Sequence, residues 1–173
     1  MGASVITSQY LGAGDTEKMK TSVYTALLTF LAVGSLLGIF GFLMNRQILL
    51  WLHTPDNIIA AAGTYLGIYF LGMPFLFMYN ILSSMFNSLG DSRTPLFLLI
   101  FSSVLNVLLD LWFVLQFGMG VAGVAIATVI AQGTAAVISF LLLMHRLNGF
   151  ETEEAVPKYD VGILKSMVKI ALP

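Results

Sequence analysis

Residues 95–117 read PLFLLIFSSVLNVLLDLWFVLQF. This run is long enough to cross the hydrocarbon core of a bilayer as a helix, which takes about 20 apolar residues. It holds one charged residue, Asp110. An ionised carboxylate is costly inside a membrane, so an acid placed there usually belongs to a functional site. The stretch therefore predicts a membrane-spanning helix that carries a site.

The composition extends this prediction to the rest of the chain. Of its 173 residues, 58% are hydrophobic and 10% are charged, against about 25% charged in soluble domains. Three long segments lack charge; they lie between Lys20 and Arg46, Asp56 and Asp91, and Asp110 and His145. Each exceeds the length of a membrane-spanning helix. We therefore expect an all-α, polytopic membrane protein. The absence of cysteine excludes disulfides, thiolate metal sites and a cysteine nucleophile.

Four full spans are predicted, at about residues 21–44, 64–87, 95–117 and 121–144. Thr94 is the expected N-cap of the third, with Pro95 at its first position. Residues 118–120 form a turn into the fourth. Residues 2–7 read as the end of another span, and residues 163–173 as the start of a helix. Both ends therefore indicate a fragment, or a reading frame begun at an internal Met. Residues 1–144 are interpreted as part of a transmembrane domain, and residues 145–173 as a linker leading to the next helix.

Basic residues give the orientation. Seven of the eight Lys and Arg residues fall on one side of the predicted spans. Because such residues favour the cytoplasmic side, the loops at 12–21, 88–94 and 145–173 are predicted to be cytoplasmic. The loops at 45–63 and 118–120 are then external.

Polar side chains inside the spans define a candidate site. Asn106 and Asp110 are four residues apart and share one helix face. Counted from a turn centred on Met119, Asp110 and Thr128 lie at equal separations, as do Asn106 and Gln132. At about 1.5 Å per residue, this predicts two polar layers about 13 and 20 Å from the turn. Whether the side chains face each other depends on helix rotation, which the sequence leaves open.

The donor types indicate the chemistry. Carboxylate, amide and hydroxyl oxygens suit a hard cation or a proton. No Lys or Arg lies in the predicted spans to neutralise Asp110, and burial disfavours an ionised carboxylate unless a cation is bound. Asp110, Asn106 and Thr128 are therefore predicted to bind a coupling cation, Na⁺ or H⁺. Further candidates to line a cavity are Gln132, Ser103, Asn80 and Ser83. The alternative is that these side chains only hydrogen-bond between helices.

Two other patterns bear on function. Gly34 and Gly38 form a small-xxx-small pattern, which is typical of close helix packing. His53 and His145 are predicted on opposite sides of the membrane, and the spans hold a single acid. A catalytic pair is therefore not expected, and the chain is predicted not to be an enzyme.

Several separated motifs resemble one known family. They are GASVITSQYLGAGD at residues 2–15, MPF at 73–75, NSLGDSRTP at 87–95, LNVLLD at 105–110 and GMGVAGVAIAT at 118–128. The chain is similar in these stretches to the multidrug and toxic compound extrusion (MATE) family, in its DinF-like branch.

The resemblance implies a twelve-helix transporter of two six-helix lobes. In it, this chain corresponds to the end of helix 2 through the start of helix 7, within the amino-terminal lobe. Such transporters lie in the cell (inner) membrane, in contact with lipid. They export amphipathic or cationic organic compounds by alternating access, coupled to Na⁺ or H⁺. No cofactor besides that ion and no nucleic acid is implied, and the rest of the transporter is an expected partner.

The resemblance also implies roles for single residues. Asn106, Asp110 and Thr128 match the cation site of archaeal and DinF-like relatives. Those relatives add an Asp from helix 1, which this chain lacks, so its Na⁺ site would be incomplete. An alternative function is a lipid-linked oligosaccharide flippase of the same superfamily, whose cavities carry basic residues. A membrane-embedded enzyme or an assembly subunit represents another class. Neither the substrate nor the choice of Na⁺ over H⁺ follows from the residues.

Overall fold

The computed structural model describes residues 2–151 and 156–171, and over these residues it is entirely helical. The helices are α1 (Gly2–Gly12), α2 (Thr16–Trp51), α3 (Asp56–Ser88), α4 (Arg93–Leu115), α5 (Gly120–Asn148) and α6 (Val161–Ala171). Helices α2 to α5 are each long and apolar enough to cross a membrane. The prediction of an all-α, polytopic membrane protein is confirmed. Residues 152–155 and 172–173 of the predicted linker lie outside the described part.

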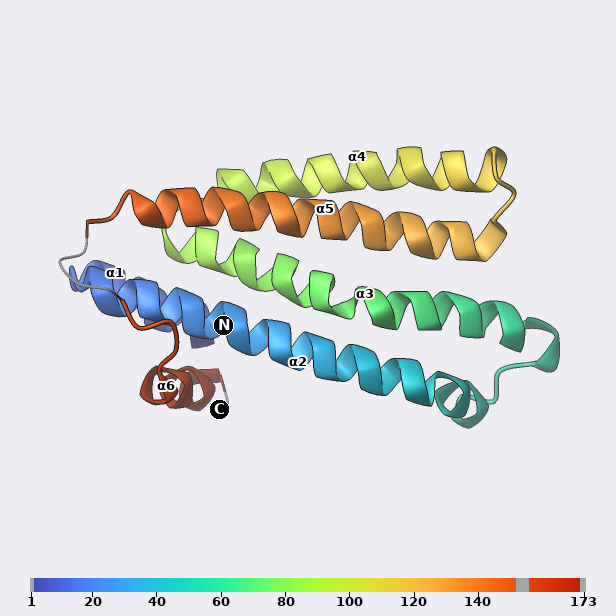
Figure 1. The fold of residues 1–173 in the computed structure, drawn as a ribbon, viewed down its shortest axis with the longest axis horizontal. Coiled ribbons are helices and arrows are strands. Elements are labelled where there is room, and N and C mark those ends of the chain that lie inside the picture. The colour runs from blue at the N-terminus through green and yellow to red at the C-terminus, as the bar shows by residue number, and fades with distance from the viewer. Residues whose placement is uncertain (1, 152–155, 172–173) are drawn as a thin grey trace.

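The four long helices lie side by side in the order α4, α5, α3, α2 (Figure 1). Helix α1 packs against α2 and α3 at one end of this bundle, and α6 packs against α1. The long helices α2, α3 and α5 extend beyond their predicted spans, whereas α4 ends at Leu115, before the predicted residue 117. The apolar run locates a span, but capping groups and turns decide where its helix ends.

The contact between α2 and α3 depends on glycines. A Cβ added at Gly38 would lie 2.6 Å from the carbonyl oxygen of Phe70, and one at Gly34 would lie 2.9 Å from Cβ of Phe77. Pro74 lies inside α3 and has no N–H to donate to the Phe70 carbonyl. Helix α3 changes direction in its middle (Figure 1), as expected at a proline. The close packing predicted for Gly34 and Gly38 is confirmed, and it occurs at this bend.

We predict that Gly38→Ala destabilises the chain by about 1–3 kcal/mol, because the new methyl group collides with backbone that cannot move aside. Gly63→Ala is the matched control. Its Cβ would lie 3.6 Å from Leu49 Cδ1, an ordinary contact at the same interface. Alanine also favours a helix over glycine by about 1 kcal/mol. Thermal unfolding in detergent should show a lower midpoint for Gly38→Ala and an unchanged or higher one for Gly63→Ala. Equal midpoints for the two variants would contradict the close contact.

An aspartate fixes the start of α4. Asp91 Oδ1 accepts hydrogen bonds from the backbone N–H groups of Arg93 and Thr94, both at 3.1 Å. The prediction of Thr94 as N-cap, with Pro95 first in the helix, is therefore wrong. The Thr94 hydroxyl instead donates to Asp91 Oδ2 at 2.7 Å. A carboxylate is the stronger acceptor and is favoured by the helix dipole. Asp91 Oδ2 also pairs with the Arg146 guanidinium at the end of α5. This ion pair joins α4 to α5 at the end of the bundle opposite their turn.

This arrangement predicts a pH dependence. Hydrogen bonds from the backbone and side chain of Thr94, and then the charge of Arg146, hold the pKa of Asp91 below its ordinary value of 3.8. A lowered pKa contributes stability above about pH 3.8, and this stability is lost as the pH falls through the folded-state value. Asp91→Asn keeps a side-chain acceptor but removes the charge. The stability difference between wild type and Asp91→Asn should therefore shrink below about pH 3.8 in thermal unfolding. A difference that stays constant down to about pH 2.5 would rule out this contribution.

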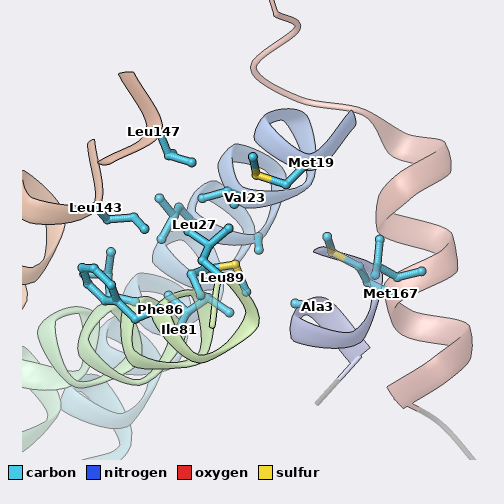
Figure 2. Packing of buried hydrophobic residues seen from close by; sticks show 14 of the residues in the cluster. Ala3, Met19, Val23, Leu27, Ile81, Phe86, Leu89, Leu143, Leu147 and Met167 are labelled. Carbon is cyan, nitrogen blue, oxygen red and sulfur yellow. The ribbon is translucent and has the colours of Figure 1, made fainter. Parts of the chain in front are cut away.

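Buried apolar side chains gather at the end of the bundle that carries α1 and α6 (Figure 2). The cluster draws Met19 and Val23 from α2, Phe86 from α3, Leu143 from α5 and Met167 from α6. Large apolar side chains farther along the bundle are exposed, as suits helices surrounded by lipid. This cluster therefore fixes α1 and α6 onto one end of the spanning helices.

Candidate functional site

The candidate site lies between α4 and α5, which a short turn joins. Gly118 and Gly120 have φ angles of +59° and +54°, a left-handed conformation that glycine adopts without strain. The backbone N–H of Met119 donates to the Phe113 carbonyl at 3.1 Å. The turn returns the chain antiparallel to α4, so polar side chains of the two helices can meet.

One hydrogen bond sets the register of the two helices. Asn106 Nδ2 donates to Thr128 Oγ1 at 3.3 Å, and this hydroxyl donates to the Val124 carbonyl at 3.0 Å. The hydrogen-bond partner of Asn106 is thus Thr128 and not Gln132, the residue at its predicted depth. Helix α4 ends at Leu115 and α5 begins at Gly120, so their midpoint falls before Met119. The observed register is therefore displaced by about one helical turn.

This contact forms part of a polar hollow of about 160 Å³. Its lining comes from three helices and comprises Tyr79 of α3; Leu99, Ser102, Ser103 and Asn106 of α4; and Thr128, Ala131 and Gln132 of α5. The structure thus brings together four of the residues singled out in the sequence: Ser103, Asn106, Thr128 and Gln132. Hydroxyl and amide groups dominate the polar lining, and none of the lining side chains is charged.

Asp110 lies one helical turn along α4 from Asn106, toward the α4–α5 turn. It is half-buried, and among the described residues its Oδ1 atom is buried without a hydrogen-bond partner. Within the described ranges, no three His, Cys, Asp or Glu side chains cluster as a metal site. Among the described residues, the further ligands available to a cation at Asp110 would therefore be neutral oxygens.

The other two candidates lie elsewhere on α3. The Asn80 amide donates to the Leu76 carbonyl of its own helix at 2.8 Å. Asn80 lines a different hollow, of about 290 Å³, between α1, α2, α3 and α6. Ser83 Oγ is buried and has no partner within the described residues. The structure therefore does not bring Asn80 to Asn106 and Thr128.

Sequence reasoning missed two polar lining residues, Tyr79 and Ser102. Tyr79 precedes Asn80 but lines the other hollow, because successive residues of a helix point about 100° apart. Tyr79 lies four residues before Ser83 and so shares its face of α3, and this spacing could have identified it. Ser102 donates to the Leu99 carbonyl at 3.0 Å. The sequence analysis selected its neighbour Ser103 instead. The sequence showed a polar face on α4, but not which face of α3 would meet it.

We predict that Asn106 and Thr128 are energetically coupled. Thr128→Val leaves the Asn106 amide without this acceptor and should cost about 1–3 kcal/mol. Thr134→Val is the matched control on the same helix. Among the described residues its hydroxyl bonds only to the Ile130 carbonyl of its own helix, at 2.8 Å, so the change should stay within about 0.5 kcal/mol.

The coupling itself is measured by a double-mutant cycle with Asn106→Leu and Thr128→Val, followed by thermal unfolding in detergent. We expect an interaction energy of about 0.5–3 kcal/mol. Additive effects of the two substitutions would show that the hydrogen bond contributes nothing to stability.

Comparisons with known proteins agree with this fold. A model of the family MatE matches residues 1–112. The chain is 37% identical over 171 residues to "Probable multidrug resistance protein YpnP" of Bacillus subtilis (strain 168), covering 97% of this chain and 37% of that protein. It is 31% identical over 179 residues to "Probable multidrug resistance protein YoeA" of the same strain, covering 99% of this chain and 39% of that protein.

A solved structure has the same helix arrangement. It is described as the "Outward-facing conformation of a multidrug resistance MATE family transporter of the MOP superfamily". The match has a TM-score of 0.87 and 20% sequence identity, and it covers 99% of this chain and 38% of that one. At this identity the likeness shows the fold alone. The chain spans 37% to 39% of the length of these three proteins.

Proposed function

Because the chain belongs to the MatE family, whose members are transporters and not enzymes, we propose that it forms part of a cation-coupled multidrug efflux transporter. The names of its relatives in Bacillus subtilis support multidrug resistance as the activity. The family prediction made from the sequence motifs is thereby confirmed, whereas its DinF-like branch stays a prediction. Alternating access and export of amphipathic organic cations belong to the proposal for the complete transporter.

The observation that carries cation coupling is Asp110, a half-buried acid on a membrane-spanning helix whose Oδ1 has no partner among the described residues. A carboxylate in this position is stabilised by binding a cation or a proton. Asn106 and Thr128 supply neutral oxygens on the side of Asp110 that faces away from the α4–α5 turn. With Nδ2 of Asn106 directed to Thr128, its Oδ1 is the amide atom available to a cation.

We propose that the hollow gives the coupling ion a polar path toward Asp110, which is not among its lining residues and lies one turn along α4 from Asn106. Ser103, Gln132 and Tyr79 add hydroxyl and amide groups beside Asn106 and Thr128. Such groups replace water around Na⁺ and can also carry a proton through bound water. Na⁺ and H⁺ therefore remain two forms of one proposed mechanism, in which the ion is a transported substrate.

The multi-pass placement in the membrane follows from the four apolar helices and the family. We propose the cell (inner) membrane, with the end of the bundle that carries Asp91 and Arg146 in the cytoplasm. Of the eight Lys and Arg residues in the chain, seven lie toward that end, and this distribution supports the orientation.

We predict that Asp110→Asn abolishes ion binding. If Na⁺ couples, NaCl should raise the unfolding midpoint of the complete wild-type transporter above that in equimolar choline chloride, because a ligand that binds the folded state stabilises it. Asp110→Asn should lose this shift, whereas Asp56→Asn, at the exposed start of α3, should keep it. In the complete transporter, dye efflux from vesicles under an imposed Na⁺ or pH gradient should stop in Asp110→Asn. Gradient-driven efflux at the wild-type rate in that variant would falsify the site.

A further inference from the structure

Helix α6 is held across the end of the bundle. In Figure 1 it is seen almost end-on, while the long helices run across the view, and it lies level with the junction of α3 and α4. Asp160 Oδ1 accepts hydrogen bonds from the backbone N–H groups of Gly162 at 2.6 Å and Ile163 at 3.1 Å. The Asp160 N–H donates to Thr25 Oγ1 of α2 at 3.1 Å. The start of α6 is therefore fixed to a membrane-spanning helix.

One face of α6 packs against α1. Ile163 and Met167, one turn apart, are buried, and Met167 lies beside Ala3 in the apolar cluster (Figure 2). The two helices approach closely, because a Cβ at Gly2 would collide with the Met167 carbonyl oxygen. Helix α6 is therefore an integral part of the bundle end.

The opposite face of α6 is basic. Lys165 and Lys169 are exposed and one turn apart, so their ammonium groups can converge on one ligand. Lys158, just before the helix, is also exposed. Over residues 2–151 and 156–171, the ion pairs involve Lys18 and Arg146, and none involves these three lysines. Helix α6 itself contains no acid.

Apolar side chains flank this basic face. Val161 is 55% exposed at the start of α6. Val168 is 47% exposed but lines the hollow that α6 shares with α1, α2 and α3. A helix with lysines on one face and exposed apolar side chains beside them is suited to the boundary between headgroups and acyl chains. Helix α6 lies level with the junction of the membrane-spanning helices α3 and α4 (Figure 1), and this position places it near that boundary.

We propose that Lys165 and Lys169 bind the headgroup of an anionic phospholipid at the membrane surface, with Val161 directed toward its acyl chains. Charge complementarity supports this ligand: two converging ammonium groups match a phosphodiester, and no acid of α6 competes for them. The apolar flank favours a lipid over a soluble phosphate, which would gain nothing from it. This proposal rests on the chain being a membrane protein and is independent of cation coupling.

The test is equilibrium binding of tail-labelled phosphatidylglycerol or phosphatidylcholine to the full chain in an uncharged detergent, followed by fluorescence anisotropy. The wild-type chain should bind phosphatidylglycerol more tightly. Lys165→Gln/Lys169→Gln should lose roughly twenty-fivefold in this affinity, since each lysine contributes roughly fivefold, and should keep its affinity for phosphatidylcholine. Raised NaCl should reduce the preference, because salt screens exposed charges. Helical content and the unfolding midpoint should not change, because both side chains are exposed.

Three variants provide controls. Lys165→Arg/Lys169→Arg keeps both charges and should keep the preference. Ser166→Gln, a neutral change near the same face, should also keep it, as should Lys18→Gln at the same end of the bundle. An equal loss in Lys18→Gln would show a general effect of charge and overturn the proposal. Displacement of phosphatidylglycerol by millimolar inorganic phosphate would assign the lysines to a soluble anion. Equal affinities of the wild-type chain for the two lipids would instead assign Lys165 and Lys169 to binding an acidic protein segment. Either result overturns the lipid assignment.

Discussion

The close packing of α3 against its neighbours is the contact on which the rest of the bundle depends. Apolar helices gain little hydrophobic free energy by leaving lipid for each other, so the quality of their packing decides which faces meet. Helix α3 is the one that contacts α1, α2, α4 and α5. Gly38 of α2 lets that helix approach the Phe70 carbonyl at the bend of α3. On the other side, a Cβ at Gly72 of α3 would lie 2.5 Å from Val129 Cγ2 of α5. Small residues thus fix α3 on both sides.

The glycine contact with α5 also positions the candidate site. Val129, which packs against Gly72, directly follows Thr128, whose hydroxyl accepts the Asn106 hydrogen bond. Helix α4 barely contacts α3 and is held mainly by α5. The α4–α5 pair is closed by the glycine turn at one end and by the Asp91–Arg146 ion pair at the other. The site therefore lies in the middle of a hairpin that is joined at both ends, and α3 reaches it through Tyr79.

The sequence predicted those parts of the structure that depend on a single helix. Charge-free runs located α2 to α5, and the spacing of Gly34 and Gly38 identified a packing face. Properties that depend on how two helices meet were harder to predict. The pairing of Asn106 depends on where α4 ends, and its end at Leu115 shifted the register by about a turn. The rotation of α3 likewise decided that Tyr79 and Asn80 line different hollows, and no periodicity in the sequence encodes that rotation.

The contrast between properties of one helix and properties of two also applies to Asp110, whose role as a ligand is still a prediction. Buried hydroxyls in helices can donate to their own backbone, as Thr128 does to Val124, so an unpaired serine or threonine can find a partner by rotating. A carboxylate has only acceptors and cannot use the carbonyls of its own helix in this way. Asp110 Oδ1 therefore needs a donor, a proton or a cation from outside α4. The neighbouring polar groups, Asn106 and Thr128, already bond to each other across the hairpin. Two neutral polar side chains that bond to each other, one turn from an acid whose Oδ1 lacks a partner among the described residues, are consistent with the proposal that an ion completes the site.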